Sequence, residues 1–163
     1  MEIIYRQYKE ADIEQIKDLL VDLLVDEAKT NEQRLKKPNA EYREKYFAEL
    51  FKEISEGKGN IIIAEENNKV IGCVVGMIPD LSEADKLEFK RIKEGYVSDL
   101  IIQVEYRHKG IGRELLKQIE NYFIEQDCTL SKLYVQKANP QAWSLYNSEG
   151  YIDKVIKMTK HLK

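Results

Sequence analysis

Residues 107–112 bring together the groups that a phosphate-binding site needs. The stretch consists of Arg107, His108, Lys109, Gly110, Ile111 and Gly112, and it stands directly before a predicted helix. A helix start exposes backbone N–H groups and the positive end of the helix dipole. The glycines have no Cβ atom, so their backbone can approach a ligand closely, and the basic side chains add donors or positive charge. The stretch therefore predicts a phosphate cradle.

Two common phosphate-binding loops do not fit this stretch. A Walker A loop requires Gly-Lys-Ser/Thr, and no such sequence follows Gly112. A dinucleotide-binding fingerprint requires a third glycine at the position where this chain has Leu115. On the hexapeptide alone, a tight turn between a strand and a helix, with glycines that bind no ligand, stays open as an alternative.

The elements on either side must hold this turn in place. Residues 97–104 form an apolar and largely β-branched run, which predicts a strand buried on both faces. The segment after the turn predicts a helix, because its apolar residues recur at helical spacing. These residues are Ile111, Leu115, Leu116, Ile119, Tyr122 and Phe123.

A second motif follows at residues 139–151, with Asn139, Ala142, Tyr146, Gly150 and Tyr151 at fixed spacing. It resembles the signature Asn-x-x-Ala-x-x-x-Tyr-x-x-x-Gly-Phe/Tyr of the GNAT superfamily of N-acyltransferases. The glycine turn resembles that family's acyl-CoA pyrophosphate loop, Arg/Gln-x-x-Gly-x-Gly/Ala. The two motifs occur in the family's order, across one predicted helix and one predicted strand. The resemblance covers residues 95–155 well, whereas the first half agrees in the order of its elements only.

The resemblance implies that acetyl-CoA binds in a V-shaped gap where two neighbouring strands splay apart. The pyrophosphate would lie on the loop amides of residues 107–112, with Arg113 in the same cofactor-binding set. The pantetheine arm would run along Leu100, Ile101 and Ile102 and would contact Asn139. The Ile102 amide would receive the thioester oxygen, since a preorganised backbone donor stabilises developing negative charge.

The resemblance also assigns the acid that protonates the departing thiolate to Tyr146. The unperturbed pKa of a tyrosine phenol is near 10, above that of a typical thiol near 8.5, so it can donate a hydrogen bond or a proton. The alternative for Tyr146 is core packing on the helix face that carries Ala142.

The group that takes the proton of the attacking amine is less well defined by the sequence. Asp99 lies on the central predicted strand, three residues before Ile102, and we predict it as the base or as the anchor of the amine. Many family members carry an acidic pair here, but this chain has Ser98 before Asp99. Tyr96, Glu94, Glu105 or an ordered water are lesser candidates, and a purely structural role of the Asp99 carboxylate stays open.

The composition excludes several other classes of protein. The chain has 163 residues, a net charge of −3 and 43% hydrophobic residues, which suggests one globular domain over residues 1–163. The absence of a basic excess argues against a nucleic-acid binder. Cys73 and Cys128 stand far apart and predict neither a disulfide framework nor a metal site. No signal peptide or membrane span is visible, so a reducing cytoplasm is the expected location.

The remaining pattern predicts an α/β domain with helices on both faces of a mixed, splayed sheet. We expect strands at residues 2–8, 60–65, 69–78 and 130–136, with one or two more in 151–163. Asn67 and Asn68 predict a hairpin turn. We expect helices at 13–24, capped by Asp12, at 40–55, and from Pro140, capped by Asn139. Residues 29–39 are expected to form a loop, and 79–94 a loop with a short helix.

These observations lead to one functional hypothesis and one alternative. The chain is expected to transfer an acetyl group from acetyl-CoA to a primary amine, on a small molecule or a protein, by direct attack and without a metal. The alternative is a non-catalytic acyl-CoA-binding or regulatory module of the same fold. No nucleic-acid or membrane partner is expected. A homodimer stays open as an alternative to a monomer, although no stretch of the sequence shows an interface.

Overall fold

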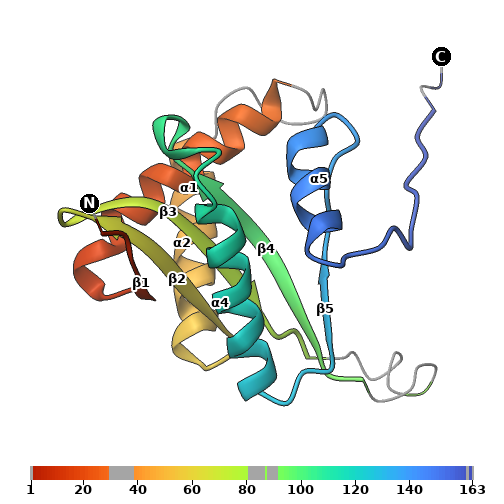
Figure 1. The fold of residues 1–163 in the computed structure, drawn as a ribbon, viewed down its shortest axis with the longest axis horizontal. Coiled ribbons are helices and arrows are strands. Elements are labelled where there is room, and N and C mark those ends of the chain that lie inside the picture. The colour runs from red at the N-terminus through yellow and green to blue at the C-terminus, as the bar shows by residue number, and fades with distance from the viewer. Residues whose placement is uncertain (1, 30–38, 81–86, 88–91, 161, 163) are drawn as a thin grey trace.

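The computed structural model describes residues 2–29, 39–80, 87, 92–160 and 162 (Figure 1). Within these residues the chain forms a sheet of five strands in the order β1-β2-β3-β4-β5. The strands are β1 (Ile4–Gln7), β2 (Gly59–Glu66), β3 (Lys69–Met77), β4 (Glu94–Ile102) and β5 (Leu130–Leu133). The pairs β1–β2, β2–β3 and β3–β4 are antiparallel, whereas β5 runs parallel to β4. The predicted mixed sheet is confirmed.

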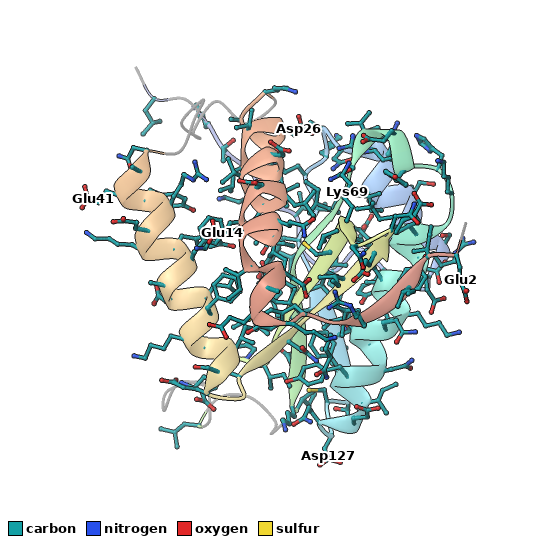
Figure 2. The ribbon with its side chains drawn as sticks, turned by 90° about the vertical axis from the view of Figure 1, so that its left-hand side faces the viewer. Glu2, Glu14, Asp26, Glu41, Lys69 and Asp127 are labelled. Atoms are coloured by element: carbon teal, nitrogen blue, oxygen red, sulfur yellow. The ribbon has the colours of Figure 1, made fainter. Side chains whose placement is uncertain are left out.

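Helices cover both faces of the sheet, as predicted. They are α1 (Ile13–Ala28), α2 (Ala40–Ser55), α4 (Ile111–Glu125) and α5 (Pro140–Ser148), with short 3₁₀ turns at Glu10–Asp12 and Val104–Tyr106. Seen from the side, α1 and α2 lie together on one side of the sheet and α4 on the other (Figure 2). In Figure 1, α5 stands beside the upper part of β5.

The two faces bury separate cores, because successive strand residues point to opposite sides. Ile61 and Ile63 of β2 pack with α1 and α2, whereas Ile62 and Ala64 pack with α4. The α4 face contains glycine where the helix comes closest. A Cβ atom on Gly76 of β3 would lie 2.4 Å from Ile119 Cγ1, so α4 can press directly against the strands only because that atom is missing.

The hairpin between β2 and β3 forms as predicted. Asn67 and Asn68 both adopt the left-handed conformation, with φ of 52° and 63°. Two consecutive residues of this kind give the turn whose twist matches the flanking strands, and asparagine tolerates the conformation better than most residues do. The predicted helix at 40–55 is confirmed, with Asn39 as its cap through a 2.7 Å hydrogen bond from the Tyr42 N–H.

The prediction that Asp12 caps the first long helix is wrong. A 3₁₀ turn precedes α1, so the backbone of Asp12 is already helical, and its side chain makes no cap hydrogen bond. Its carboxylate instead accepts hydrogen bonds of 2.7 Å from Arg6 Nη1 and from the Lys9 N–H. The hydrogen bond from Arg6 lowers the pKa of Asp12. The carboxylate thus binds Arg6 and caps the start of the 3₁₀ turn through the Lys9 N–H, and it does not cap α1.

The prediction of one or two final strands is also wrong for the described residues. Residues 151–160 form no strand, and beyond Tyr151 they are exposed. Most of the predicted insert at 79–94 and of the loop at 29–39 lies outside the described residues. Among the helices that the structure describes, none combines the length and the apolar character needed to cross a bilayer.

Candidate functional site

The edge of β4 that faces β5 is only partly paired. The register joins the two strands from Glu94–Leu130 to Val97–Leu133 and ends there. On its other edge β4 stays paired with β3 as far as Ile102, opposite Gly72. Residues 98–102 therefore have one edge that no strand of the described sheet covers.

The direction of the β4 amides follows from its pairing with β3. The Gln103 N–H donates to the Ile71 carbonyl over 2.9 Å. Backbone groups along a strand alternate between its two edges, so the N–H groups of Ile102 and Leu100 point away from β3, toward the open edge. This is the orientation that the predicted role of the Ile102 amide requires, and the role itself stays a prediction.

A β-bulge decides where Asp99 points. Val75 pairs with Asp99 and Gly76 with Val97, so no residue of β3 stands opposite Ser98 in the register, although the Ser98 hydroxyl donates to the Val75 carbonyl over 3.4 Å. Without the extra residue, Asp99 would share the α4 face with Val97. The bulge turns Asp99 to the face covered by α1 and α2. There the Tyr46 hydroxyl of α2 donates a hydrogen bond of 3.3 Å to Asp99 Oδ2.

The charge of Asp99 also acts on two further tyrosines, Tyr96 and Tyr146. Burial raises the pKa of Tyr146 to about 12, and the negative charges of Asp99 and Glu27 add to the rise. The pKa of Tyr96 is raised by burial first and by Asp99 second. We call Glu27, Tyr46, Tyr96, Asp99 and Tyr146 the tyrosine–carboxylate cluster. Its members come from α1, α2, β4 and α5.

The outer side of this cluster is also aromatic. Tyr42 stacks on Tyr46 with ring centroids 5.8 Å apart, and Tyr134 meets Tyr96 edge-on at the same distance. The Tyr134 ring is 79% exposed. Aromatic ring faces and carboxylates both carry negative potential, so their combination suits a cation.

The glycine turn lies where predicted, immediately before α4. Gly110 is the residue before the helix and has φ of +82°. The first helical hydrogen bond runs from the Glu114 N–H to the Gly110 carbonyl, so the amides of Ile111, Gly112 and Arg113 precede the helical ladder. A Cβ atom on Gly112 would lie 3.0 Å from Ile102 Cδ1. The start of α4 thus touches the end of the open edge.

The basic side chains of the turn do not act alike. His108, with φ of +62°, and Lys109 are exposed. Arg107 turns inward: its Nε donates to the Ile102 carbonyl over 3.0 Å, and its Nη2 lies 3.4 Å from Asp26 Oδ2. Figure 2 shows Asp26 at the end of α1. Arg107 therefore ties the end of β4 to α1.

Arg113 and Asn139 hold α5 in place. Arg113 Nε donates to Glu149 Oε1 over 2.5 Å, which joins the start of α4 to the end of α5. Asn139 Oδ1 accepts the Ala142 N–H over 3.1 Å, so the predicted cap is confirmed. The predicted contacts of both residues with a cofactor stay predictions.

Sequence reasoning missed two members of the tyrosine–carboxylate cluster. Glu27 stands in a polar stretch at the end of α1 and gave no signal. Tyr46 was expected among the apolar residues of the second helix, and its hydroxyl contact with Asp99 crosses 53 residues of sequence. Cys73 is buried next to the cluster, and burial raises its pKa, followed by the charge of Asp99. Among the described residues, no three His, Cys, Asp or Glu side chains are placed to hold a metal ion.

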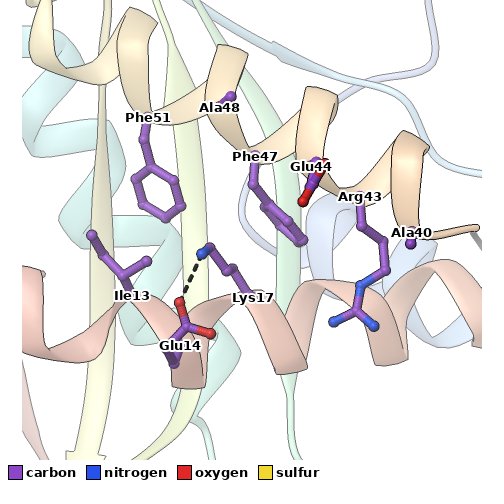
Figure 3. Close-up of a pocket in the computed structure, with 9 residues that line it drawn as sticks. All are labelled: Ile13, Glu14, Lys17, Ala40, Arg43, Glu44, Phe47, Ala48 and Phe51. Atoms are coloured by element: carbon purple, nitrogen blue, oxygen red, sulfur yellow. Dashed lines mark hydrogen bonds and ion pairs between the residues drawn. The ribbon is translucent and has the colours of Figure 1, made fainter.

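A pocket of about 510 Å³ lies elsewhere, between α1 and α2 (Figure 3). It is lined by Ile13, Glu14, Lys17, Ala40, Arg43, Glu44, Phe47, Ala48 and Phe51. An ion pair of 2.7 Å between Lys17 and Glu14 crosses its rim. None of the predicted site residues contributes to this pocket, so it is distinct from the open edge of β4.

Comparison with known proteins gives a family match over most of the chain. The model of the acetyltransferase (GNAT) family matches residues 20–151. An uncharacterised N-acetyltransferase of Archaeoglobus fulgidus is 27% identical over 59% of this chain and 62% of its own length. Spermidine N(1)-acetyltransferase of Thermoplasma acidophilum is 30% identical over 67% of this chain and 63% of its own. The chain thus spans less than two thirds of these curated relatives.

Solved structures share the fold at low sequence identity. A predicted acetyltransferase with acetyl-CoA from Clostridium acetobutylicum has a TM-score of 0.75 and 19% identity, covering 98% of this chain and 96% of its own. The aminoglycoside acetyltransferase AAC(6')-Iy, in complex with a bisubstrate analogue, has a TM-score of 0.74 and 13% identity, covering 99% and 100%. Both align over almost their whole length.

The left-handed conformation of Gly110 gives a testable prediction about the turn. A Cβ atom there would meet nothing within 4 Å, so replacement costs only backbone strain. We expect Gly110→Ala to lower the free energy of unfolding by about 1–2 kcal/mol. Gly110→Asn is the matched control and should lose less, because asparagine tolerates this conformation. Urea denaturation measures both, and equal losses for the two variants would contradict the assignment.

Proposed function

This chain belongs to the acetyltransferase (GNAT) family, and we propose that it transfers an acetyl group from acetyl-CoA to a primary amine. The observation that carries the proposal is the open edge of β4 between Val97 and Ile102. The start of α4 adjoins the end of that edge, and Tyr96 and Asp99 of the tyrosine–carboxylate cluster lie on the same strand. Phosphate-binding amides, a strand edge and ionisable groups thus come together in one place.

The open edge fits the cofactor because it offers the groups that the cofactor needs. The pantetheine arm contains amide groups, which can pair with the outward N–H and carbonyl of Leu100 as an added strand would. The pyrophosphate would lie on the amides before and within the first turn of α4, at residues 109–113. Arg107 and Arg113 already have protein partners, so we assign phosphate binding to the backbone first. A fold neighbour that was solved with acetyl-CoA supports the choice of this cofactor.

The proposed reaction is a direct attack in which atoms and charges balance. The neutral amine nitrogen attacks the thioester carbonyl carbon and a C–N bond forms. The oxygen gains negative charge, which the Ile102 N–H stabilises as a fixed donor. The C–S bond then breaks, the thiolate departs with a hydrogen bond from Tyr146, and the proton released by the amine passes to Asp99 directly or through water.

The raised pKa of Tyr146 limits what this residue can do. A pKa of about 12 keeps the phenol protonated at neutral pH, so it is always ready to donate. That value lies about 3.5 units above the ordinary pKa of a thiol, so complete proton transfer to the thiolate costs about 5 kcal/mol. We therefore assign Tyr146 a hydrogen bond to the forming thiolate. Protonation of Asp99 would remove one of the charges that raise the Tyr146 pKa and would strengthen this donation.

The acceptor is proposed from the charge of the site. Asp99 and Glu27 bring negative charge, and the exposed ring of Tyr134 offers a face to a cation. Such a surface attracts an amine that arrives protonated. The relatives include a spermidine N(1)-acetyltransferase, whose name specifies an amine acceptor. We propose a primary amine on a small molecule or on a protein.

Thiol release from acetyl-CoA tests the proposal. We expect CoA to raise the melting temperature of the protein, and at least one amine to cause release, in a panel of polyamines, aminoglycosides, amino acids and basic peptides. A thermal shift without release from any acceptor, or from cell extract, would favour the non-catalytic acyl-CoA-binding module instead. A folded protein with neither response would refute both.

Removal of the Tyr146 hydroxyl should slow turnover without unfolding the protein. We expect Tyr146→Phe to lower kcat by roughly 10- to 100-fold, the value of one hydrogen bond to a charged group, with little change in the acceptor KM. Tyr122→Phe on α4 is the matched control and should behave as the parent. Steady-state kinetics over pH 6–10 measures both, and an unchanged kcat for Tyr146→Phe would remove Tyr146 from the mechanism.

The two roles open to Asp99 predict different kinetics. We expect Asp99→Asn to lower kcat/KM by at least about 100-fold, because the site loses its strand carboxylate. A loss confined to kcat identifies a base, whereas a rise in the acceptor KM identifies an anchor for the ammonium group. Glu125→Gln, which changes an exposed carboxylate at the end of α4, is the control and should keep the parent kinetics. Parent-like kinetics in Asp99→Asn would leave this carboxylate a structural role only.

A further inference from the structure

A hydrogen bond joins α2 to the carboxylate of the central strand. The Tyr46 hydroxyl donates to Asp99 Oδ2 over 3.3 Å, across 53 residues of sequence. Both side chains are half-buried. The β-bulge at Ser98 is what turns Asp99 toward this helix, so the contact depends on an irregularity of the strand. Neither of the two sequence motifs includes Tyr46, and the reaction proposed above gives it no role.

The Tyr46 ring is held by two aromatic neighbours. It stacks on Tyr42, with ring centroids 5.8 Å apart and an interplanar angle of 6°. The buried ring of Phe47 meets it edge-on, with centroids 5.3 Å apart and an angle of 64°. Both arrangements are favourable for aromatic pairs, and together they restrict how the Tyr46 ring can swing. The hydroxyl therefore points at Asp99 in a fixed direction.

Tyr46 can act only as a donor in this contact. Burial raises the pKa of Tyr46, and the negative charge of Asp99 adds to the rise. The hydroxyl therefore keeps its proton at neutral pH. An ionised carboxylate accepts hydrogen bonds and has no proton to give. A hydrogen bond from a neutral phenol to such an acceptor stabilises the ionised form of the carboxyl group.

Four further elements bring titratable groups to the surroundings of Asp99. They are Glu27 of α1, Cys73 of β3, Tyr96 of β4 and Tyr146 of α5. After burial, the charge of Asp99 raises the pKa of the thiol and of both phenols, and Glu27 acts on the same two phenols. Burial and a second negative charge both favour the protonated form of a carboxyl group. The hydrogen bond from Tyr46 acts in the opposite direction.

The protonation of Asp99 decides what this carboxyl group can do for an amine. In its protonated form it can neither take a proton from the amine nor attract an ammonium group. We propose that Tyr46 is a positioning residue for the acetyl transfer, whose hydroxyl holds the Asp99 carboxylate ionised and aimed at the acceptor amine. The inference rests on the proposed function. It holds for both roles open to Asp99, because a base and an anchor each need a charged carboxylate in a fixed orientation.

The titration of the Asp99 carboxyl group tests the contact without any turnover. In protein labelled with ¹³C-aspartate and free of substrates, NMR follows Asp99 Cγ from about pH 4 to 8, and Asp99→Asn identifies its signal. We expect Tyr46→Phe to move the midpoint upward by about 0.5–1 pH unit, because the ionised form loses one donor. Tyr8→Phe is the matched control: its ring packs in the same core, and among the described residues its hydroxyl makes no hydrogen bond. An unchanged midpoint in Tyr46→Phe would overturn the proposal.

Kinetics in two backgrounds test whether the contact serves the reaction. We expect Tyr46→Phe to lower kcat/KM by roughly 10-fold in the parent, while Tyr8→Phe leaves it unchanged. In the Asp99→Ala background the same change at Tyr46 should cost less than about twofold, because the partner is already missing. A purely structural role of Tyr46 predicts equal losses in both backgrounds. Circular dichroism confirms that each variant is folded.

The outcomes separate this proposal from the proposed function. A folded parent that releases no thiol with any acceptor would refute the acetyl transfer, and with it the role of Tyr46 in that reaction. A parent that turns over, combined with equal losses in the two backgrounds, would leave the acetyl transfer standing and overturn the role of Tyr46 alone. A raised midpoint together with unequal losses supports both.

Discussion

Between Val97 and Ile102, β4 keeps its hydrogen bonds to β3 but parts from β5, and the site depends on that parting. A strand in the middle of a sheet normally forms backbone hydrogen bonds to neighbouring strands along both of its edges. Here the antiparallel neighbour β3 holds the backbone of β4 rigidly. The parallel neighbour β5 pairs with β4 over one short stretch only. The exposed amides are therefore held by the sheet itself and need no reorganisation when a ligand arrives.

The bulge at Ser98 determines which face of the same strand carries Asp99. One inserted residue exchanges the faces of everything that follows, so Asp99 joins Tyr96 on the α1–α2 side. The open edge and the carboxylate thus come from neighbouring residues and move together. The charge on Asp99 then reaches across to α5, where it helps to keep the Tyr146 proton in place. Strand geometry and the protonation of a distant helix residue are in this way coupled.

The sequence predicts well those features that depend on local pattern. The helix at 40–55, the Asn67–Asn68 turn and the glycine start of α4 each follow from spacing and from backbone preference alone. The cap predicted from Asp12 did not form on α1 because a 3₁₀ turn precedes that helix, and the Asp12 carboxylate binds Arg6 and the Lys9 N–H at the start of this turn. The final strands failed because a strand needs a neighbouring edge, which local pattern does not supply. Glu27 and Tyr46 were missed because their position depends on how helices pack over β4.

Arg107 has an effect on this strand that goes beyond tying two elements together. A bare strand edge invites any extended chain to pair with it, and such pairing is a common origin of aggregation. The Arg107 guanidinium donates a hydrogen bond to the Ile102 carbonyl, so the last acceptor on this edge already has a partner. The part of the β4 edge that stays free is only a few residues long, and the charged Arg107 guanidinium blocks its far end. This free edge is long enough to pair with a narrow ligand that carries a few amide groups. It is too short for strands of other chains to add to it and form a growing sheet.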